Sequence, residues 1–186
     1  MRAKDHYTVK AKLSGLRARS AYKLMQINRK FGLIKPMDSV LDLGCWPGGW
    51  LIVAKRCRAG RVVGVDIKSI DKIKGVEFIQ GNIEDNKTLA KIKGKFDVVL
   101  SDMAPSTCGN KVIDNAVQHD LAETALKVAI QFLVPGGKFL VKVFQGEGYM
   151  QLINKVKEHF SMVKTVKPLA SRKGSREMYI LADGFK

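Results

Sequence analysis

The fold is decided by the stretch Val40-Leu41-Asp42-Leu43-Gly44-Cys45-Trp46-Pro47-Gly48-Gly49-Trp50. Its apolar beginning predicts a buried strand, its glycines predict a tight loop, and the apolar pattern that resumes at Leu51 predicts a helix. Gly44, Gly48 and Gly49 have no Cβ atom, so the backbone there can approach a ligand closely. The helix start adds free N–H groups and the positive end of a helix dipole. We therefore expect a nucleotide-type pocket at the carboxyl end of a central strand.

The spacing of these glycines excludes two common nucleotide-binding motifs. A dinucleotide fingerprint reads G-x-G-x-x-G, and a phosphate loop reads G-x-x-x-x-G-K-[ST]. The order here is G-C-W-P-G-G, and no lysine follows the last glycine. A nicotinamide dehydrogenase is therefore disfavoured, and a tight turn without a ligand is the plainer alternative. Against that alternative, the next predicted strand ends at Asp66, an acid that can accept hydrogen bonds from ribose hydroxyls.

The charge of the chain predicts a polyanionic partner. The 186 residues carry a formal net charge of +16. Residues 1–35 contain ten lysines and arginines and one acid, Asp5. Residues 155–176 contain seven lysines and arginines and one acid, Glu158. Two basic blocks in one chain are typical of nucleic-acid binding, although a solvated basic surface would have the same composition. We expect RNA or DNA to contact both blocks.

Cysteines, histidines and apolar runs limit the other classes of function. The residues that could bind a metal or form disulfides are Cys45, Cys57, Cys108, His6, His119 and His159. The odd number of cysteines, with no C-x-x-C pair, argues against a disulfide framework and a zinc site, so we expect no metal. No apolar run approaches the roughly 20 residues that span a bilayer. Because no apolar signal core lies near the amino terminus, we expect a cytoplasmic location and no membrane partner. We also expect a monomer.

The hydrophobic pattern predicts alternating strands and helices. We expect strands at Ser39–Leu43, Arg61–Asp66, Val76–Gln80, Phe96–Ser101, Lys138–Phe144, Met162–Lys167 and Glu177–Ala182. We expect helices at Arg17–Phe31, Gly48–Cys57, Lys87–Ile92, Asn115–Phe132 and Tyr149–Phe160. Such alternation indicates a parallel, doubly wound sheet with helices on both faces. No helix pattern separates the last two strands, so one of them should run antiparallel. We expect one domain over residues 1–186, in which residues 1–35 form a basic arm and a helix.

Four polar residues stand out once this sheet is drawn. Lys142 lies in an apolar strand, where a lysine must be paired, reach a cleft or lose its proton. Asp102 follows the carboxyl end of the fourth strand, the edge that carries ligands in parallel sheets. Glu177 begins the last strand, whose start reaches the same edge if that strand is antiparallel beside the fifth. Lys23 lies on the first helix. Taken alone, the lysine on the helix could be solvated, the aspartate could be a cap, and the glutamate could pair at the surface.

These residues and their neighbours carry a specific resemblance. D-L-G-x-x-P-G-G-W followed by V-D-I resembles the S-adenosylmethionine pocket of Rossmann-like class I methyltransferases. Lys23, Asp102, Lys142 and Glu177 resemble the Lys-Asp-Lys-Glu tetrad of RNA ribose 2'-O-methyltransferases. The segments that resemble the FtsJ family are Arg19–Leu24, Ser101–Pro105, Val141–Gly146 and Ser175–Tyr179. Viral cap methyltransferases share the tetrad alone. The four longer segments and the compact length of the chain favour the cellular family.

The resemblance implies an activity and a set of site residues. Family members transfer a methyl group from S-adenosylmethionine to a ribose 2'-hydroxyl, and bacterial members act on a uridine in the A-loop of large-subunit ribosomal RNA. Lys142 is implied as the general base or as the group that orients the hydroxyl. Asp102 and Glu177 are implied to hold Lys142 and the ribose, and Lys23 to complete the network and place its charge near the substrate. The residues implied in cofactor binding are Gly44, Gly48, Trp50, Asp66, Asn82 and Asp102.

Two positions depart from the family pattern, and two other functions stay open. Cys45-Trp46 stands where small residues are common, so the tryptophan could narrow the pocket or point outward. Asn82 replaces an acid that commonly contacts adenine, and its side-chain oxygen can still accept a hydrogen bond. Transfer RNA is the alternative substrate. A nonenzymatic RNA-binding assembly factor is the alternative class, because a fold does not fix a function.

Overall fold

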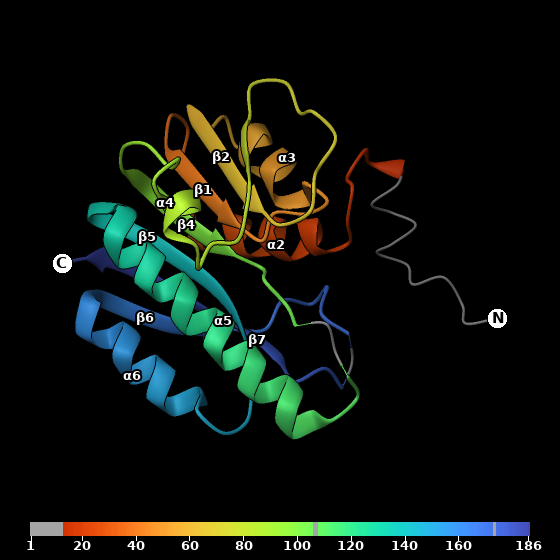
Figure 1. Ribbon diagram of the computed structural model, residues 1–186, viewed down its shortest axis with the longest axis vertical. Helices are drawn as coiled ribbons and strands as arrows, with labels where there is room; N and C mark the ends of the chain where they lie inside the picture. Colours follow the sequence, from red (N-terminus) through yellow and green to blue (C-terminus); the bar gives the residue numbers. More distant parts are fainter. Residues whose placement is uncertain (1–12, 106–107, 173) are drawn as a thin grey trace.

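One seven-stranded sheet forms the centre of the protein in the computed structural model, which describes residues 13–105, 108–172 and 174–186. The strand order is β3-β2-β1-β4-β5-β7-β6 (Figure 1). The strands are β1 (Ser39–Leu43), β2 (Arg61–Asp66), β3 (Glu77–Gln80), β4 (Phe96–Ser101), β5 (Leu133–Phe144), β6 (Phe160–Val166) and β7 (Glu177–Phe185). β1 to β5 pair in parallel, whereas β7 runs antiparallel to both of its neighbours. The predicted mostly parallel α/β sheet with an antiparallel last strand is confirmed.

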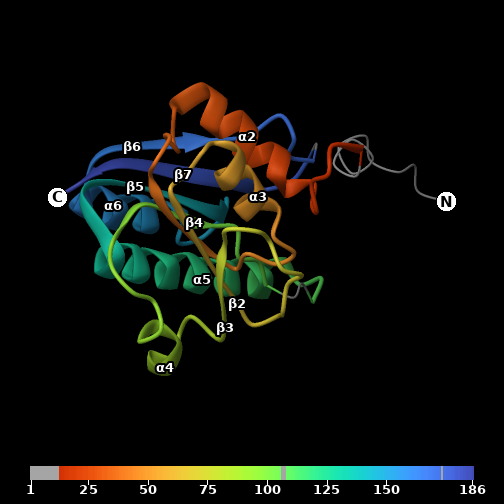
Figure 2. The ribbon, with the colours of Figure 1, turned by 90° about the horizontal axis from the view of Figure 1, so that it is seen from above.

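Helices cover both faces of this sheet. They are α2 (Ser20–Phe31), α3 (Gly49–Arg56), α4 (Asn86–Leu89), α5 (Lys111–Phe132) and α6 (Tyr149–His159). One hydrophobic cluster joins the sheet to α2 and α3, and a second joins its other face to α5 and α6. Figure 2 shows α2 and α3 on one side of the strands and α5 on the other. The predicted basic arm falls largely on residues 1–12, which lie outside the described part of the chain.

The alternation of side chains along the strands assigns each residue to one of the two layers. Val40 and Leu100 pack in the cluster with α2 and α3, whereas Leu41 and Val99 pack in the cluster with α5 and α6. Successive side chains of a strand point to opposite faces, so a strand buried on both sides needs apolar residues at both parities. That requirement explains the nearly continuous apolar runs of the central strands.

The first described helix shows how the local sequence sets its ends and its buried face. Ala21, Leu24 and Ile27 of α2 are almost fully buried, as their helical spacing predicts. The helix ends at Gly32, which adopts a left-handed conformation with φ of 59° and donates its N–H to the carbonyl of Asn28. Glycine is favoured at such a position because it has no Cβ atom to collide with the preceding turn. Lys23 faces the sheet on this same helix and is only 8% exposed.

The largest differences from the predicted element boundaries are at the starts of α5 and β5. α5 begins at Lys111 and not at Asn115, because the side chain of Asn110 accepts hydrogen bonds from the N–H groups of Val112 and Ile113 and caps the helix. β5 begins at Leu133 and not at Lys138, and its pairing with β4 is irregular between Phe96 and Val98. The start of α5 was missed because it lies in a polar stretch, and the start of β5 was missed because a Pro-Gly-Gly sequence follows it. Neither difference moves the carboxyl edge of the sheet.

No helix among the described residues is long and apolar enough to cross a membrane.

We predict that Gly64→Ala destabilises the fold by overpacking. Gly64 lies in the central strand β2, and a Cβ atom there would lie 2.8 Å from Cys45 Sγ and 2.9 Å from Leu51 Cδ1. Extra atoms in a packed core cost about 1–3 kcal/mol of unfolding free energy. Urea unfolding followed by circular dichroism measures this loss. Asn154→Ala, at an exposed position of α6, is the matched control, and equal stability of the two variants would contradict the packing described here.

Candidate active site

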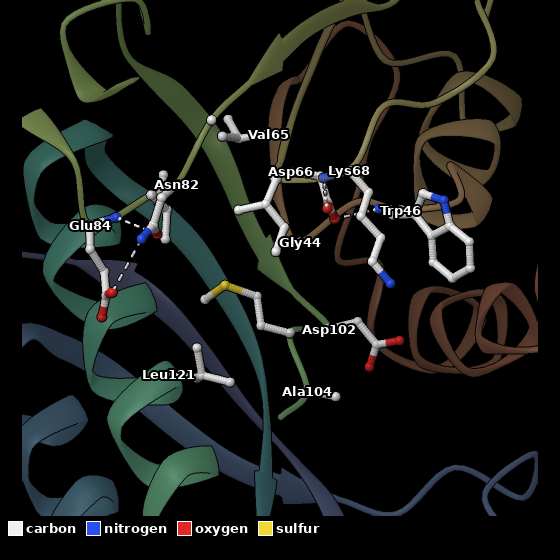
Figure 3. A pocket seen from close by; sticks show the side chains of 14 residues that line it. Gly44, Trp46, Val65, Asp66, Lys68, Asn82, Glu84, Asp102, Ala104 and Leu121 are labelled. Carbon is white, nitrogen blue, oxygen red and sulfur yellow. Dashed lines mark hydrogen bonds between the residues drawn. The ribbon is translucent and has the colours of Figure 1, made fainter. Parts of the chain in front are cut away.

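A cavity of about 430 Å³ lies at the carboxyl edge of the sheet. Gly44 follows β1, Asp66 ends β2 and Asp102 follows β4 around it, as Figure 3 shows from close by. Met103, the residue after Asp102, also lines the cavity. β1 lies between β2 and β4, so the strand order reverses here, and ligands of open α/β sheets bind at such a reversal. The volume is in the range of small-molecule sites.

Two glycines make room for this cavity and its walls. Gly44 has φ of 71°, and a Cβ atom there would collide with the Cγ atom of Met103. A Cβ atom at Gly81 would likewise collide with the hydroxyl of Thr88. Both glycines line the cavity, so the backbone itself forms part of its surface. A ligand in this cavity can therefore approach main-chain atoms closely, as the sequence predicts for Gly44.

Asp66 ties together the two loops at one side of the cavity. Its Oδ2 accepts a hydrogen bond of 2.8 Å from the N–H of Trp46, and its Oδ1 accepts one of 2.8 Å from the N–H of Lys68. The carboxylate is thereby fixed at the end of β2, as Figure 3 shows. Each carboxylate oxygen has further lone-pair capacity, so hydroxyl groups of a ribose can still donate to it.

Asn82 lies on the opposite side of the cavity from Trp46 (Figure 3). Its Oδ1 accepts a 3.1 Å hydrogen bond from the N–H of Glu84, and its Nδ2 lies 3.5 Å from Oε2 of Glu84. The amide is thus held by its own turn. The Trp46 indole is 53% exposed at the rim, with Lys68 Nζ 4.7 Å from its ring centroid. Of the two arrangements left open by the sequence, the tryptophan points outward.

Gly48 and Trp50 do not line the cavity, in contrast to the other predicted cofactor residues. A Cβ atom at Gly48 would lie 2.9 Å from Ile73 Cδ1, on another loop. Trp50 is 3% exposed, and its Nε1 donates to the carbonyl of Ser20 at 2.9 Å. Its ring centroid lies 6.0 Å from that of Tyr179. The Trp50 side chain is therefore a core residue, and a cofactor contact through its main chain at the start of α3 stays a prediction.

The four charged residues singled out in the sequence form two ion pairs. Lys23 Nζ of α2 lies 2.6 Å from Oε1 of Glu177 and donates to its Oε2 at 2.7 Å. The Ser171 hydroxyl also donates to Oε1 of Glu177 at 2.9 Å. Lys142 Nζ of β5 donates to the main-chain oxygen of Asp102 at 2.7 Å and lies 3.3 Å from its Oδ1. Both lysines are more than nine-tenths buried, and each has a carboxylate as counter-charge.

Tyr179 connects the two ion pairs. It lies opposite Lys142 in the antiparallel pairing of β5 with β7, and its hydroxyl donates to Oδ1 of Asp102 at 2.8 Å. Lys23 Nζ lies 5.8 Å from the centroid of its ring. Burial raises the pKa of the Tyr179 hydroxyl, and the charges of Asp102 and Glu177 raise it further. The hydroxyl therefore keeps its proton at neutral pH and serves as a fixed donor.

The strand register explains why these groups meet. Lys142 faces Tyr179 across the β5–β7 ladder, and Glu177 lies two residues before Tyr179, so all three side chains leave the same face of the sheet. α2, which carries Lys23, packs on that face. Asp102 belongs to both the cavity and the ion pair. The site is thus a nucleotide-sized cavity whose wall includes Asp102, and Asp102 connects that cavity to the two lysine–carboxylate pairs.

Two residues with functional geometry were not predicted as site residues. Tyr179 reads in the sequence as one apolar position of a strand. Asp42 is 1% exposed, and neither of its carboxyl oxygens has a hydrogen-bond partner among the described residues. Burial raises the pKa of Asp42 well above its usual range, with further contributions from Asp102 and Asp66. An acid inside an apolar strand was the available signal for Asp42.

The basic residues near the site have structural partners. Arg17 donates to the carbonyls of Pro47 and Asp71 at 3.2 and 2.8 Å, and so holds the loop after β1 against the loop after β2. Arg19 donates to the carbonyl of Ala170 at 2.6 Å. Both belong to the predicted basic block, which therefore also stabilises the loops of this edge. No group of three His, Cys, Asp or Glu residues that could hold a metal ion occurs in the part of the chain that the structure describes.

Comparison with known proteins gives one consistent result. The model of the family described as FtsJ-like methyltransferase matches residues 16–185. A ribosomal RNA large subunit methyltransferase E of Methanothrix thermoacetophila is 49% identical over 96% of this chain and 71% of its own. One of Granulibacter bethesdensis is 44% identical over 98% of this chain and 81% of its own. The crystal structure of a ribosomal RNA methyltransferase from Plasmodium falciparum has a TM-score of 0.81 and 31% identity, over 91% of this chain and 98% of that one.

We predict that Asp42→Asn changes how stability depends on pH. An acid with a raised pKa in the folded state binds its proton more tightly there, so its contribution to stability falls as pH rises above the unfolded-state pKa of about 3.9. The unfolding free energy of the variant relative to wild type should rise by up to about 1.4 kcal/mol per pH unit in that interval. Urea unfolding between pH 4 and 8 without cofactor measures it. A difference that stays constant with pH would contradict a buried, unpaired carboxyl.

Proposed function

Because the chain belongs to the FtsJ-like methyltransferase family, we propose that it transfers a methyl group from S-adenosylmethionine to a ribose 2'-hydroxyl of RNA. The observation that carries this proposal is the pair of buried lysine–carboxylate contacts beside a nucleotide-sized cavity. Lys142 Nζ is held by Asp102, which also lines that cavity. A group that handles the substrate hydroxyl is thereby fixed next to the proposed cofactor.

The cavity has the donors and acceptors that S-adenosylmethionine requires. Asp66 would accept hydrogen bonds from the ribose hydroxyls, and Asn82 would lie at the adenine end. Gly44 has no Cβ atom, so it leaves the room that a side chain would fill. The first-turn N–H groups of α3, including those of Gly49 and Trp50, would face the carboxylate of the methionine moiety.

The chemistry needs positioning and the removal of one proton. Bound S-adenosylmethionine supplies a methyl group that its sulfonium already activates, so the residues of the chain need only align a nucleophile with it. Alignment of two reactants can lower a barrier by several kcal/mol, up to about 7–11 kcal/mol in model reactions. Lys142 would orient the 2'-hydroxyl through its Nζ or, as a neutral amine, accept its proton, while the carbonyl and carboxylate of Asp102 hold that Nζ in place. Glu177 and Lys23 would hold the ribose.

The named relatives support ribosomal RNA as the substrate. Both are called ribosomal RNA large subunit methyltransferase E, and the aligned parts cover nearly all of this chain. We propose a uridine in the A-loop of the large-subunit RNA as the target, and the cytoplasm as the place where the protein acts as a monomer. The net charge of +16 supports a polyanionic substrate of this kind.

We predict that Lys142→Ala lowers methyl transfer by about 10²–10⁴-fold, the usual contribution of a general acid or base. Affinity for S-adenosylmethionine, measured by isothermal titration calorimetry, should stay within a few-fold of wild type. Lys138→Ala is the matched control, because Lys138 lies on the same strand but does not line the cavity, and its Nζ donates to the carbonyl of Gly32. Wild-type turnover by Lys142→Ala would end the proposal.

A second substitution separates the two roles of Lys142. Arginine keeps a positive charge that does not dissociate in proteins, so Lys142→Arg can orient a hydroxyl but cannot accept its proton. Loss of turnover in both variants supports a general base. Turnover retained by Lys142→Arg alone would assign an orienting role.

The substrate is tested by mapping ribose methylation. The purified protein is incubated with labelled S-adenosylmethionine and with RNA from cells that lack this protein. We expect the label in large-subunit ribosomal RNA, at the A-loop uridine. Label in transfer RNA would instead identify transfer RNA as the substrate. No transfer to any RNA, with RNA binding intact, would instead indicate a nonenzymatic assembly factor.

A further inference from the structure

A second cavity, of about 350 Å³, lies beside the proposed active site and has no role in the chemistry described above. Its walls are the first turns of α5, the loop from β5 into α6, and Arg176 at the start of β7. Figure 1 shows the beginning of α5 and the β5–α6 loop at the same end of the molecule. We call it the α5 cavity.

The loop wall of the α5 cavity is packed directly against the helix. A Cβ atom at Gly146 would lie 2.8 Å from Asn115 Nδ2, and one at Gly148 would lie 2.8 Å from His119 Nε2. Asn115 donates to the carbonyl of Glu147 at 3.0 Å, and His119 Nε2 lies 3.1 Å from that of Gly148. The cavity is therefore a built feature of the fold and not a gap between loose segments.

A buried, unsatisfied acceptor lies in the wall of the α5 cavity. Asn115 is 7% exposed, and its Oδ1 has no hydrogen-bond partner among the described residues. Buried polar atoms are nearly always hydrogen-bonded, so a ligand that brings a donor to this wall would satisfy the acceptor. The exocyclic amino and ring N–H groups of nucleobases are donors of this kind.

Cations and an apolar surface complete the lining. Lys111 and Arg176 lie together, since the Arg176 guanidinium donates to the carbonyl of Lys111 at 3.4 Å. Val112, 72% exposed, adds an apolar face. Asp120 and Glu147 also line the cavity, so an anion would bind at the Lys111 end. Two cations can bind a phosphate, an apolar face can stack against a base, and an acceptor can bind the hydrogen-bond donors of that base. Proteins recognise a nucleotide of single-stranded RNA with this combination of groups.

The α5 cavity is continuous with the catalytic residues along two strands. β5 carries Lys142 and ends at Phe144, just before Gly146, and Arg176 immediately precedes Glu177. The N–H of Gln145 donates to the carbonyl of Arg176 at 2.9 Å, which joins the two strand ends. Gly146 follows Lys142 by four residues, and four residues of extended chain span about 13 Å. Neighbouring nucleotides of one RNA strand can bridge that distance between Lys142 and the α5 cavity.

We propose that the α5 cavity binds a nucleotide that flanks the methylated ribose, with its phosphate at Lys111 and Arg176 and its base against Val112 and Asn115. This inference rests on the proposed RNA methyltransferase function and adds to it a subsite for the substrate. The subsite fixes the register of the RNA strand, so that the correct 2'-hydroxyl reaches Lys142. It acts on the affinity for RNA and not on the affinity for S-adenosylmethionine.

Two exposed positions of α5 allow a test that leaves the core intact. Ala116→Trp fills the α5 cavity, and Lys111→Ala removes one phosphate contact. Lys127→Ala, at an exposed position of the same helix away from the cavity, is the matched control. We expect the first two variants to raise the KM for an RNA with nucleotides on both sides of the target at least five-fold. The logarithmic salt dependence of RNA binding should become shallower by about 0.7 in Lys111→Ala.

Cross-linking gives a readout that a structural role would not produce. RNA with 4-thiouridine on either side of the target should cross-link to α5 or to the β5–α6 loop in wild type, and this product should disappear in Ala116→Trp. Cross-links only to other segments, together with a KM equal to that of Lys127→Ala, would overturn the subsite while methyl transfer by wild type continues. No methyl transfer to any RNA by wild type would instead overturn the function on which the subsite rests.

Discussion

Two buried lysines that need counter-charges are the constraint on which the site depends. Lys23 and Lys142 are each more than nine-tenths buried, and an unpaired ammonium at that depth would cost several kcal/mol. Glu177 meets the first and Asp102 the second. Removal of one partner from a buried pair costs about 3–5 kcal/mol, so each carboxylate contributes to the stability of the fold. Such pairs seldom add net stability over apolar residues, which supports a functional reason for the lysines.

The antiparallel insertion of β7 satisfies that constraint. Its start lies at the same edge as the carboxyl ends of β1, β2 and β4, so Glu177 arrives beside the residues that follow the parallel strands. Tyr179, two residues later, reaches Asp102 and packs beneath Lys23. The same strand order places the reversal between β1 and β4 at the cavity. One topological choice thus joins a nucleotide-sized cavity to a charged cluster.

Much of this arrangement was predictable from the sequence, and the failures have physical reasons. β1, β2 and β4 have the predicted bounds because fully buried strands read as apolar runs bounded by turns. The start of α5 was missed because the cap at Asn110 follows a polar stretch that resembles a loop. Lys142 was singled out because it violates the apolar pattern of its strand, whereas the tetrad as a set was implied by the family resemblance.

Side-chain direction was the limit of the sequence reasoning. Trp50 follows the glycine loop, but its helix turns the indole into the core, against Tyr179. Tyr179 fits the apolar pattern of β7, so only the β5–β7 register shows that it faces Lys142. The orphan oxygens of Asp42 and Asn115 also depend on what surrounds them in three dimensions. Neither the composition nor the spacing of the chain contains that information.

The most direct test of the central claim is a crystal structure of the protein with S-adenosylmethionine bound. We expect the ribose hydroxyls of the cofactor within hydrogen-bond distance of Asp66 and its methyl group directed toward Lys142 Nζ. The two lysine–carboxylate pairs should keep the contacts described above. A cofactor bound elsewhere, or one whose methyl group is turned away from Lys142, would contradict the claim that this cluster carries out the transfer.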